Sequence, residues 1–375
     1  HDAVTKQCTV TLSQDCPAVG VEKQSKLDKK AFHIPVTIGL LDSSGKALPL
    51  RSASLPSAHT QAVLELTEPT QTWVFDGLAT APTPSLLRDF SAPVLIDYAY
   101  TDEELALLCA HDSNAFTRWE ASQEIASRKM IELAKAWRTS GTFSELDPLL
   151  ESSWSVSLHD KNLDAGYRAR LLTLPPGAAV AEQMSQMDPL AIQEVRTRLR
   201  EQLAQRQLSA LMETYNANGT PGAYSPAPGP SGKRALKNLA LSYLMAAQLP
   251  DAHAMAKEQF EHATNMTDRM AAFGAIVADG SAEASAAAAT RFYEEWQHDQ
   301  LVVDKWFSAL ASSPRTGVDG ITGLMQHPAF TLRNPNRARS VIFAFCMANP
   351  RGFHAPDGSG YAFWGDQVLA LDAIN

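Results

Sequence analysis

Thr101-Asp-Glu-Glu104 divides the sequence into two parts with different hydrophobic periods. The four residues form a capping box, in which the Thr101 hydroxyl accepts a hydrogen bond from the third helical N–H and the Glu104 carboxylate accepts one from the N–H of Thr101. The box predicts that a helix begins at residue 102. Apolar residues alternate with period two before this point and recur with the helical period after it.

Short strand-like segments fill the sequence before Thr101. They are rich in β-branched and aliphatic residues and are bounded by turn or proline signals such as Asp42-Ser-Ser-Gly45. The predicted strands are residues 9–12, 34–41, 62–66, 72–75 and 94–98. Because no helix separates them, residues 1–100 predict an Ig-like antiparallel β-sandwich of about seven strands.

Residues 101–375 carry the pattern of amphipathic helices. Asp188-Pro189 and Asn334-Pro335 each place a capping residue before a proline at the first helical position. We expect about ten to twelve helices in antiparallel pairs. Since no clean sequence repeat is present, the pattern predicts an irregular all-α superhelix of helix pairs, HEAT- or armadillo-like. One predicted helix face consists of Met130, Leu133, Ala134 and Trp137.

One segment interrupts the helical pattern. Residues 218–233 are dense in Gly, Pro and Ser, which break helices and favour turns. We therefore expect a mobile loop there rather than a helix.

The composition excludes several classes of partner. The 375 residues include 32 basic and 41 acidic side chains, for a net charge of −9, and the charges are spread evenly. There is thus no basic face to bind nucleic acid or an anionic membrane, and no apolar stretch long enough to span a bilayer. The four cysteines form no CxxC pair, which is typical of free, mostly buried thiols in a reducing compartment. We expect a cytoplasmic protein with no nucleic-acid or membrane partner.

Both ends of the sequence resemble breaks in a longer chain. It begins at His1 without an initiator Met or a targeting segment. It ends at Asn375 inside an apolar-periodic run with no helix-stop signal. We therefore expect a fragment whose helical domain lacks its C-terminal end.

The sequence contains no motif of a catalytic centre. HExxH, GxSxG and the Walker loop are all absent. Glu258 and His262 could share a helix face, but two ligands do not bind zinc tightly, so we expect a solvated ion pair. Asp357-Gly-Ser-Gly360 lacks the third glycine of a dinucleotide fingerprint and predicts a tight turn.

The strongest polar cluster is Arg333-Asn-Pro-Asn-Arg-Ala-Arg339. It places Arg337 and Arg339 in a first helical turn, where the helix dipole disfavours cations. Two arginines at a position of unfavourable electrostatic energy point either to an anionic or carboxylate partner or to an interhelical ion pair with an acidic neighbour. Spacing alone favours the ion pair, because most arginines serve structure or solvation.

Several strings, in family order, resemble bacterial aminopeptidase N, a family of zinc-dependent, thermolysin-like enzymes. They include His33-Ile-Pro-Val-Thr-Ile-Gly-Leu40, His111-Asp-Ser-Asn-Ala-Phe-Thr-Arg-Trp-Glu120, Asn265-Met-Thr-Asp268, Asp304-Lys-Trp-Phe307 and Asn334-Pro-Asn-Arg337. The family has four domains, and the resemblance covers only the last two, a β-sandwich and a helical C-terminal domain. The HExxH zinc motif and the GxMEN stretch belong to the catalytic domain, so the resemblance implies no catalytic residue, metal ligand or cofactor in this chain.

The resemblance also implies a role for the helical domain. In the family this domain caps the catalytic domain and encloses the active-site cavity, and the arginine that faces the cavity matches Arg339. We therefore expect Arg339, Asn336 and Arg337 to line the substrate cavity of a complete enzyme, with zinc bound in the missing catalytic domain. The expected partners are that catalytic domain, on the same polypeptide, and a peptide substrate. The chain alone is expected to be inactive, and its docking face to be exposed and apolar. The alternative is a stand-alone helical-repeat adaptor that binds a protein partner.

Overall fold

The computed structural model describes residues 1–24, 29–53 and 59–374, and the chain divides into two compact units. The sheet unit consists of His1–Ala126 and Pro148–Ser157, and the helical unit of Ser127–Asp147 and Leu158–Asn375. The predicted domain boundary between residues 100 and 101 stays a prediction.

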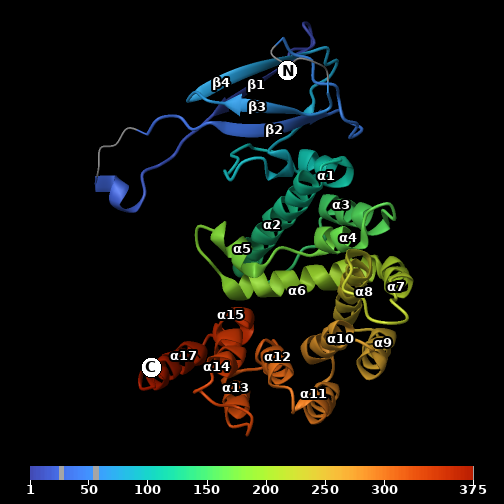
Figure 1. Ribbon diagram of the computed structural model, residues 1–375, viewed down its shortest axis with the longest axis vertical. Coiled ribbons are helices and arrows are strands. Elements are labelled where there is room, and N and C mark those ends of the chain that lie inside the picture. Colours follow the sequence, from blue (N-terminus) through green and yellow to red (C-terminus); the bar gives the residue numbers. More distant parts are fainter. Residues whose placement is uncertain (25–28, 54–58, 375) are drawn as a thin grey trace. The chain divides into compact units, whose positions relative to one another are not determined.

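Two small antiparallel sheets form the first part of the sheet unit (Figure 1). In one, β1 (Gln7–Ser13) pairs with β4 (Thr70–Asp76); in the other, β2 (Ile34–Leu41) lies between β3 (Ala62–Leu66) and β5 (Thr83–Ser85). The sheets share one hydrophobic core, because alternate residues of β2 point into it together with residues of β3 and β4. The core consists of Val36, Ile38, Leu40, Leu50, Leu64, Phe75, Leu78 and Leu86. The predicted order of an antiparallel β domain followed by a helical domain is confirmed.

The strand predicted at residues 94–98 is wrong, and the described residues form five strands rather than about seven. After β5 the chain passes through the short 3-10 helix η2 (Arg88–Phe90), where Leu87, Asp89 and Phe90 adopt positive φ angles of 55°, 57° and 52°. Beyond it, the N–H of Val94 donates to the carbonyl of Ala92 two residues back, so the segment begins in a local turn. Leu95 is fully exposed, which shows that the hydrophobic character of this segment does not reflect burial.

The predicted capping box is present at the start of α1 (Asp102–His111). The Thr101 hydroxyl accepts from the N–H of Glu104 at 3.2 Å, and the Glu104 carboxylate accepts from the N–H of Thr101 at 2.9 Å. The long helix α2 (Ala115–Ser140) and α3 (Pro148–His159) follow and contribute residues to both units.

The rest of the chain is helical (Figure 1). Consecutive helices pack on one another from α9 to α12, as expected for stacked helix pairs. The described residues hold more helices than the ten to twelve predicted, because four-residue helices such as α14 and α16 carry no periodic pattern. The elements are α4 (Ala165–Leu172), α5 (Gly177–Glu182), α6 (Pro189–Arg206), α7 (Leu208–Ala217), α8 (Pro228–Ala246), α9 (Pro250–His262), α10 (Met266–Asp279), α11 (Ala282–Trp296), α12 (Gln300–Ala311), α13 (Val318–Met325), α14 (Pro335–Ala338), the π-helix η3 (Arg339–Phe343), α15 (Ala344–Ala348), α16 (Pro350–Phe353) and α17 (Ser359–Asp372).

The loop predicted at residues 218–233 is too long at its C-terminal end. Residues 219–227 lie outside helices, but α8 begins at Pro228 and includes Gly232. Proline is favoured at the first helical position because its fixed φ suits the helix and its missing N–H is not needed there. Gly232 packs so closely on α4 that a Cβ at this position would lie 2.7 Å from the backbone nitrogen of Gly166. The glycine therefore serves helix packing rather than a turn.

Two further expectations concern the membrane and the thiols. No helix of the described residues combines the length and the apolar character needed to cross a membrane. All four cysteines are free, as predicted, but the expectation that they are mostly buried is wrong: Cys109 is buried, Cys8 and Cys346 are half-buried, and Cys16 is exposed.

Candidate functional site

Residues 335–348 form one run of helical backbone built from α14, η3 and α15, and it carries the three predicted site residues. Asn334 caps this run as predicted: its Oδ1 accepts from the N–H groups of Asn336 at 3.0 Å and Arg337 at 3.4 Å. Pro335 occupies the first turn. The cap fixes where the run starts and hence which side chains point inward.

Arg337 points into the protein and is only 1% exposed. Its Nε donates to Asp304 Oδ1 at 2.6 Å, its Nη1 to the carbonyl of Ala329 at 2.8 Å, and its Nη2 to Gln300 Oε1 at 2.7 Å. The guanidinium carbon also lies 5.1 Å from the ring centroid of Phe307. Arg337 thus forms the interhelical ion pair that spacing alone favoured.

Arg339 lies two residues further and is exposed, at the first position of the π-helix. No hydrogen bond or ion pair of its guanidinium is found within the part of the chain that the structure describes. Asn336 is exposed as well, and Phe343 and Met347 are 59% and 67% exposed. These four residues follow at spacings of three, four and four, so they share one side of the run. We call them the Arg339 face.

The π-helix sets the orientation of the Arg339 face. Single π-turns inside α-helices occur often at functional sites. Here the Ser340 hydroxyl donates to the carbonyl of Arg337 at 2.8 Å, a side-chain contact that bends helices. At the end of the run, Asn349 donates to the carbonyls of Ser313 at 2.7 Å and Thr316 at 2.8 Å. The run is therefore held at both ends by Arg337 and Asn349.

Sequence reasoning favoured an ion pair for Arg337 but did not identify its partner, and it missed Asn349. Asp304 stands 33 residues before Arg337, and Asn349 stands 36 residues after Ser313, so no local spacing marks either pair. The only available signal was that Asp304 occurs in one of the strings that resemble the family.

His327 adds an aromatic contact beside Arg337. Its ring lies 4.5 Å from that of Tyr293, 5.2 Å from that of Trp306 and 5.6 Å from that of Phe307. The backbone N–H of Ala329 donates to its Nδ1 at 3.2 Å, which requires an unprotonated nitrogen there. Burial, and next the positive charge of Arg337, lower the pKa of His327 below 6.5.

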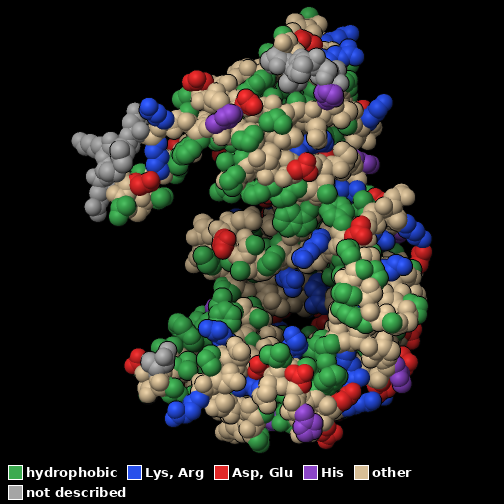
Figure 2. Space-filling view, viewed as in Figure 1, with side chains coloured by type: hydrophobic (Ala, Val, Ile, Leu, Met, Phe, Trp, Pro, Cys, Tyr) green, Lys and Arg blue, Asp and Glu red, His purple; other side chains and the backbone are tan. Residues whose placement is uncertain are grey.

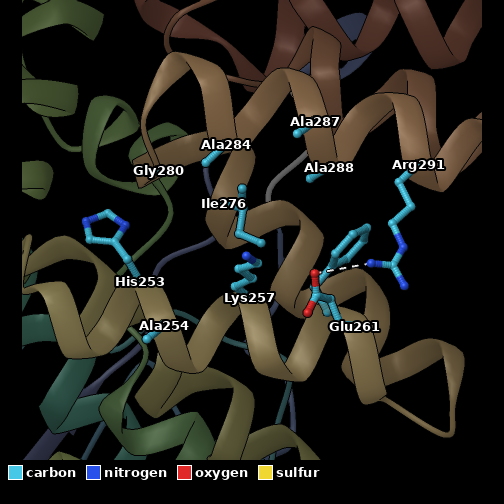
Figure 3. Close-up of a pocket in the computed structure, with 11 residues that line it drawn as sticks. His253, Ala254, Lys257, Glu261, Ile276, Gly280, Ala284, Ala287, Ala288 and Arg291 are labelled. Carbon is cyan, nitrogen blue, oxygen red and sulfur yellow. Dashed lines mark hydrogen bonds and ion pairs between the residues drawn. The ribbon is translucent and has the colours of Figure 1, made fainter.

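A hollow of about 500 Å³ lies between α9, α10 and α11 (Figure 3). Its walls are mostly small and apolar, with Ile276, Ala284 and Ala288 among the lining residues. Figure 3 shows Glu261 and Arg291 facing each other from α9 and α11, and their ion pair measures 3.1 Å. We call this hollow the α9–α11 groove.

Glu258 and His262, and the segment at Asp357, form the ion pair and the tight turn that the sequence predicted. Glu258 and His262 form an exposed ion pair of 3.7 Å. Asp357 Oδ1 accepts from the N–H of Ser359 at 3.0 Å, next to Gly358 at φ 74°, which is a tight turn. In residues 1–24, 29–53 and 59–374, no three His, Cys, Asp or Glu side chains group as metal ligands.

The last helix presents apolar side chains to solvent. Tyr361, Trp364 and Val368 of α17 are 52%, 51% and 46% exposed and follow at helical spacing. Figure 2 shows hydrophobic side chains at the surface around this end of the helical unit. Exposed aromatic residues in a row are typical of surfaces that contact another protein segment.

Comparison with known families gives a match over nearly the whole chain. Residues 102–375 match a domain of unknown function (DUF3458_C) described as ARM repeats. Residues 1–99 match a domain of unknown function (DUF3458) described as an Ig-like fold.

Individual relatives agree with this match. Aminopeptidase N of Escherichia coli (strain K12) is 37% identical over 376 residues, and that of Haemophilus influenzae (strain ATCC 51907) 31% over 377 residues. Each alignment includes the whole of this chain but 42% of the relative, so the chain spans about two fifths of their length. A crystal structure of Legionella pneumophila aminopeptidase A in complex with aspartic acid superposes on the whole chain with a TM-score of 0.80 at 27% identity, covering 42% of that protein.

Proposed function

Because this chain belongs to the ARM-repeat family DUF3458_C, with an Ig-like domain before it, and corresponds to the C-terminal portion of aminopeptidase N, we propose that it is the non-catalytic part of a peptide-cleaving enzyme. Its helical unit caps the catalytic domain of the same polypeptide and forms one wall of the substrate cavity. The Arg339 face is turned toward that cavity. Such an enzyme would act in the cytoplasm on the N-terminal residues of peptides.

The observation that carries this proposal is the contrast between Arg337 and Arg339. Arg337 has its charge neutralised by Asp304, whereas Arg339 is exposed and has no acidic partner in the described parts of the chain. A free guanidinium binds carbonyl or carboxylate groups by paired hydrogen bonds, which suits the backbone or C-terminus of a peptide. Phe343 and Met347 beside it provide apolar contact for peptide side chains.

We propose that the zinc of such an enzyme is bound in its catalytic domain. The described residues provide no group of three metal ligands, and the sequence lacks HExxH. A catalytic zinc site needs three protein ligands and an open position for water. In this proposal the chain supplies walls and support for the cavity.

The test uses the complete polypeptide with Arg339→Met. Losing one charged contact to the peptide predicts a KM about tenfold higher, the factor that 1.4 kcal/mol represents, with kcat changed less than about twofold. The matched control is Arg333→Met, which removes an exposed arginine before the helical run and should leave both constants unchanged. Equal KM values for the Arg339 variant and the parent would contradict the role of this face.

A second assay tests whether this chain lacks catalytic activity of its own. This chain alone, supplied with zinc, should release no amino acid from a peptide. Zinc-dependent turnover by the isolated chain would overturn the proposal of a non-catalytic part.

The second candidate is a protein-binding adaptor, favoured by the α9–α11 groove and its small apolar wall. ARM-like helix stacks offer extended surfaces for partners. Ala287→Glu, which places a charge on the lining of the groove, would then abolish capture of a partner while leaving peptide hydrolysis by the complete polypeptide unchanged. Under the first proposal the same variant changes neither property.

A further inference from the structure

A small recess opens where the segment before α8 meets the start of α10. It measures about 350 Å³ and lies entirely within the helical unit. Among its lining residues are Tyr224, Lys233 and Arg234, together with Gly229 of α8 and Thr264 before α10. No aspartate or glutamate lines it. We call it the Arg234 recess.

Arg234 is a buried cation without an acidic partner. It is 3% exposed, and its Nη2 donates to the carbonyl of Ser225 at 2.7 Å and to the hydroxyl of Ser231 at 3.1 Å. Its Nε has no acceptor, and no ion pair of Arg234 is found within residues 1–24, 29–53 and 59–374. An uncompensated buried charge is costly, so proteins pair such groups or bind a counter-charge.

Three other buried arginines of the chain are paired with acids, whereas Arg168, like Arg234, donates to a backbone carbonyl. Arg88 pairs with Asp112 and Arg337 with Asp304, and Arg269 forms an ion pair with Glu295. The neighbours of Arg234 supply only neutral oxygens and the ring of Tyr224, whose centroid lies 4.6 Å from the guanidinium carbon. A stacked aromatic ring stabilises the cation partly but does not neutralise it.

The start of α8 adds further positive potential. Its N-cap residue Ala227 has no side-chain acceptor, and Pro228 and Pro230 have no N–H. The N–H of Gly229 has no acceptor among the described residues, and it belongs to a residue that lines the recess. An uncapped helix start attracts anions through such free N–H groups and the helix dipole. Lys233, exposed one turn later, adds a second cation.

We propose that the Arg234 recess binds a small oxyanion, a phosphate or a carboxylate group, which supplies the negative charge that Arg234 lacks. The guanidinium and the Lys233 ammonium bind its oxygens, the N–H of Gly229 donates to it, and the ring of Tyr224 holds the guanidinium in place. The site lies within this chain and does not depend on the proposed peptidase role.

The experiment titrates the chain with inorganic phosphate and, separately, with acetate, at constant ionic strength set by chloride. Nuclear magnetic resonance follows the backbone amide of Gly229, and thermal unfolding follows stability, which a ligand of the folded state raises. We expect one anion or both to shift the Gly229 signal saturably and to raise the midpoint temperature of thermal unfolding. Response to phosphate alone identifies a phosphate site, and response to acetate identifies a carboxylate site.

Matched variants separate specific binding from general attraction. Lys233→Gln removes an exposed charge and should weaken binding about tenfold, whereas Lys305→Gln, an equal charge change at an exposed position of α12, should leave it unaltered. Arg234→Met should abolish binding; if it does not fold, Lys233→Gln still decides. The proposal is overturned if neither anion shifts Gly229, or if both lysine variants weaken binding equally.

Discussion

Arg88 and Asp112 form a buried ion pair of 2.7 Å, in which both side chains are at most 2% exposed. The pair joins the segment after β5 to the end of α1, within the sheet unit. Arg88 also donates from its Nε to the Ser85 hydroxyl at 2.8 Å, and it fills the space next to Gly39, where a Cβ would lie 2.5 Å from the guanidinium carbon. The first helix after the capping box is thereby fixed to the strands before it.

Arg88→Met should destabilise the chain by about 3–5 kcal/mol, because it leaves the Asp112 carboxylate buried without a counter-charge. Urea unfolding measures this loss. Arg88→Met combined with Asp112→Leu should recover much of it, since no unpaired charge remains. Lys161→Met removes half of an exposed ion pair with Glu213 and should leave the urea midpoint unchanged. A double variant no more stable than the single one would show that the pair is not the cause.

Arg337→Lys should cost about 2 kcal/mol or more, although the charge is kept. A lysine ammonium cannot reach Asp304, Ala329 and Gln300 with the planar geometry of the guanidinium, so charged hydrogen bonds are lost. Arg339→Lys, two residues away on the exposed side, should stay within about 0.5 kcal/mol of the parent. Equal losses for the two variants would contradict the separate roles of these arginines.

Local signals in the sequence predicted local structure well. The capping box at Thr101 and the cap at Asn334 depend on residues three apart or fewer, and both form. The bounds of β2 agree at both ends because residues 34–41 are rich in β-branched and aliphatic residues, and the last six of them are buried. By contrast, residues 94–98 have strand composition but pair with no strand among the described residues, and a strand needs a partner that composition cannot reveal.

The candidate site was predictable in position but not in detail. The resemblance led to the segment with Arg337 and Arg339, yet which of the two points inward depends on Asp304, on another helix. The Arg234 recess had no signal at all, since the Gly- and Pro-rich composition of residues 218–233 predicted only a loop. Both the orientation of the two arginines and the formation of the Arg234 recess depend on contacts between elements that lie far apart in the sequence.

Gly232→Ala should destabilise the helical unit by about 1–3 kcal/mol, because the added methyl group meets the backbone of Gly166 and forces α4 and α8 apart. The matched control is Gly274→Ala in α10, where a Cβ meets nothing within 4 Å. That variant should gain about 0.5–1 kcal/mol, as alanine restricts the unfolded chain and favours helix. Thermal unfolding of both variants measures the contrast. Two shifts of the same sign would contradict close packing at Gly232.

The stability of the chain should fall as the pH drops through the range in which histidines titrate. Burial lowers the folded-state pKa of His327 and of His354 below the value of 6.5 expected in the unfolded chain, with Arg337 adding to the effect on His327. As the pH falls below about 6.5, the unfolded state therefore binds protons that the folded state does not, and the free energy of unfolding decreases until the folded-state pKa is passed. Well above the unfolded-state pKa of 6.5 both states are largely neutral at these positions and little slope results. Urea unfolding between pH 7.5 and pH 5 should show this decrease, and His327→Gln, whose side-chain oxygen can still accept from the N–H of Ala329, should make it shallower. A slope that is equally steep in the parent and in His327→Gln would show that His327 carries none of the pH dependence.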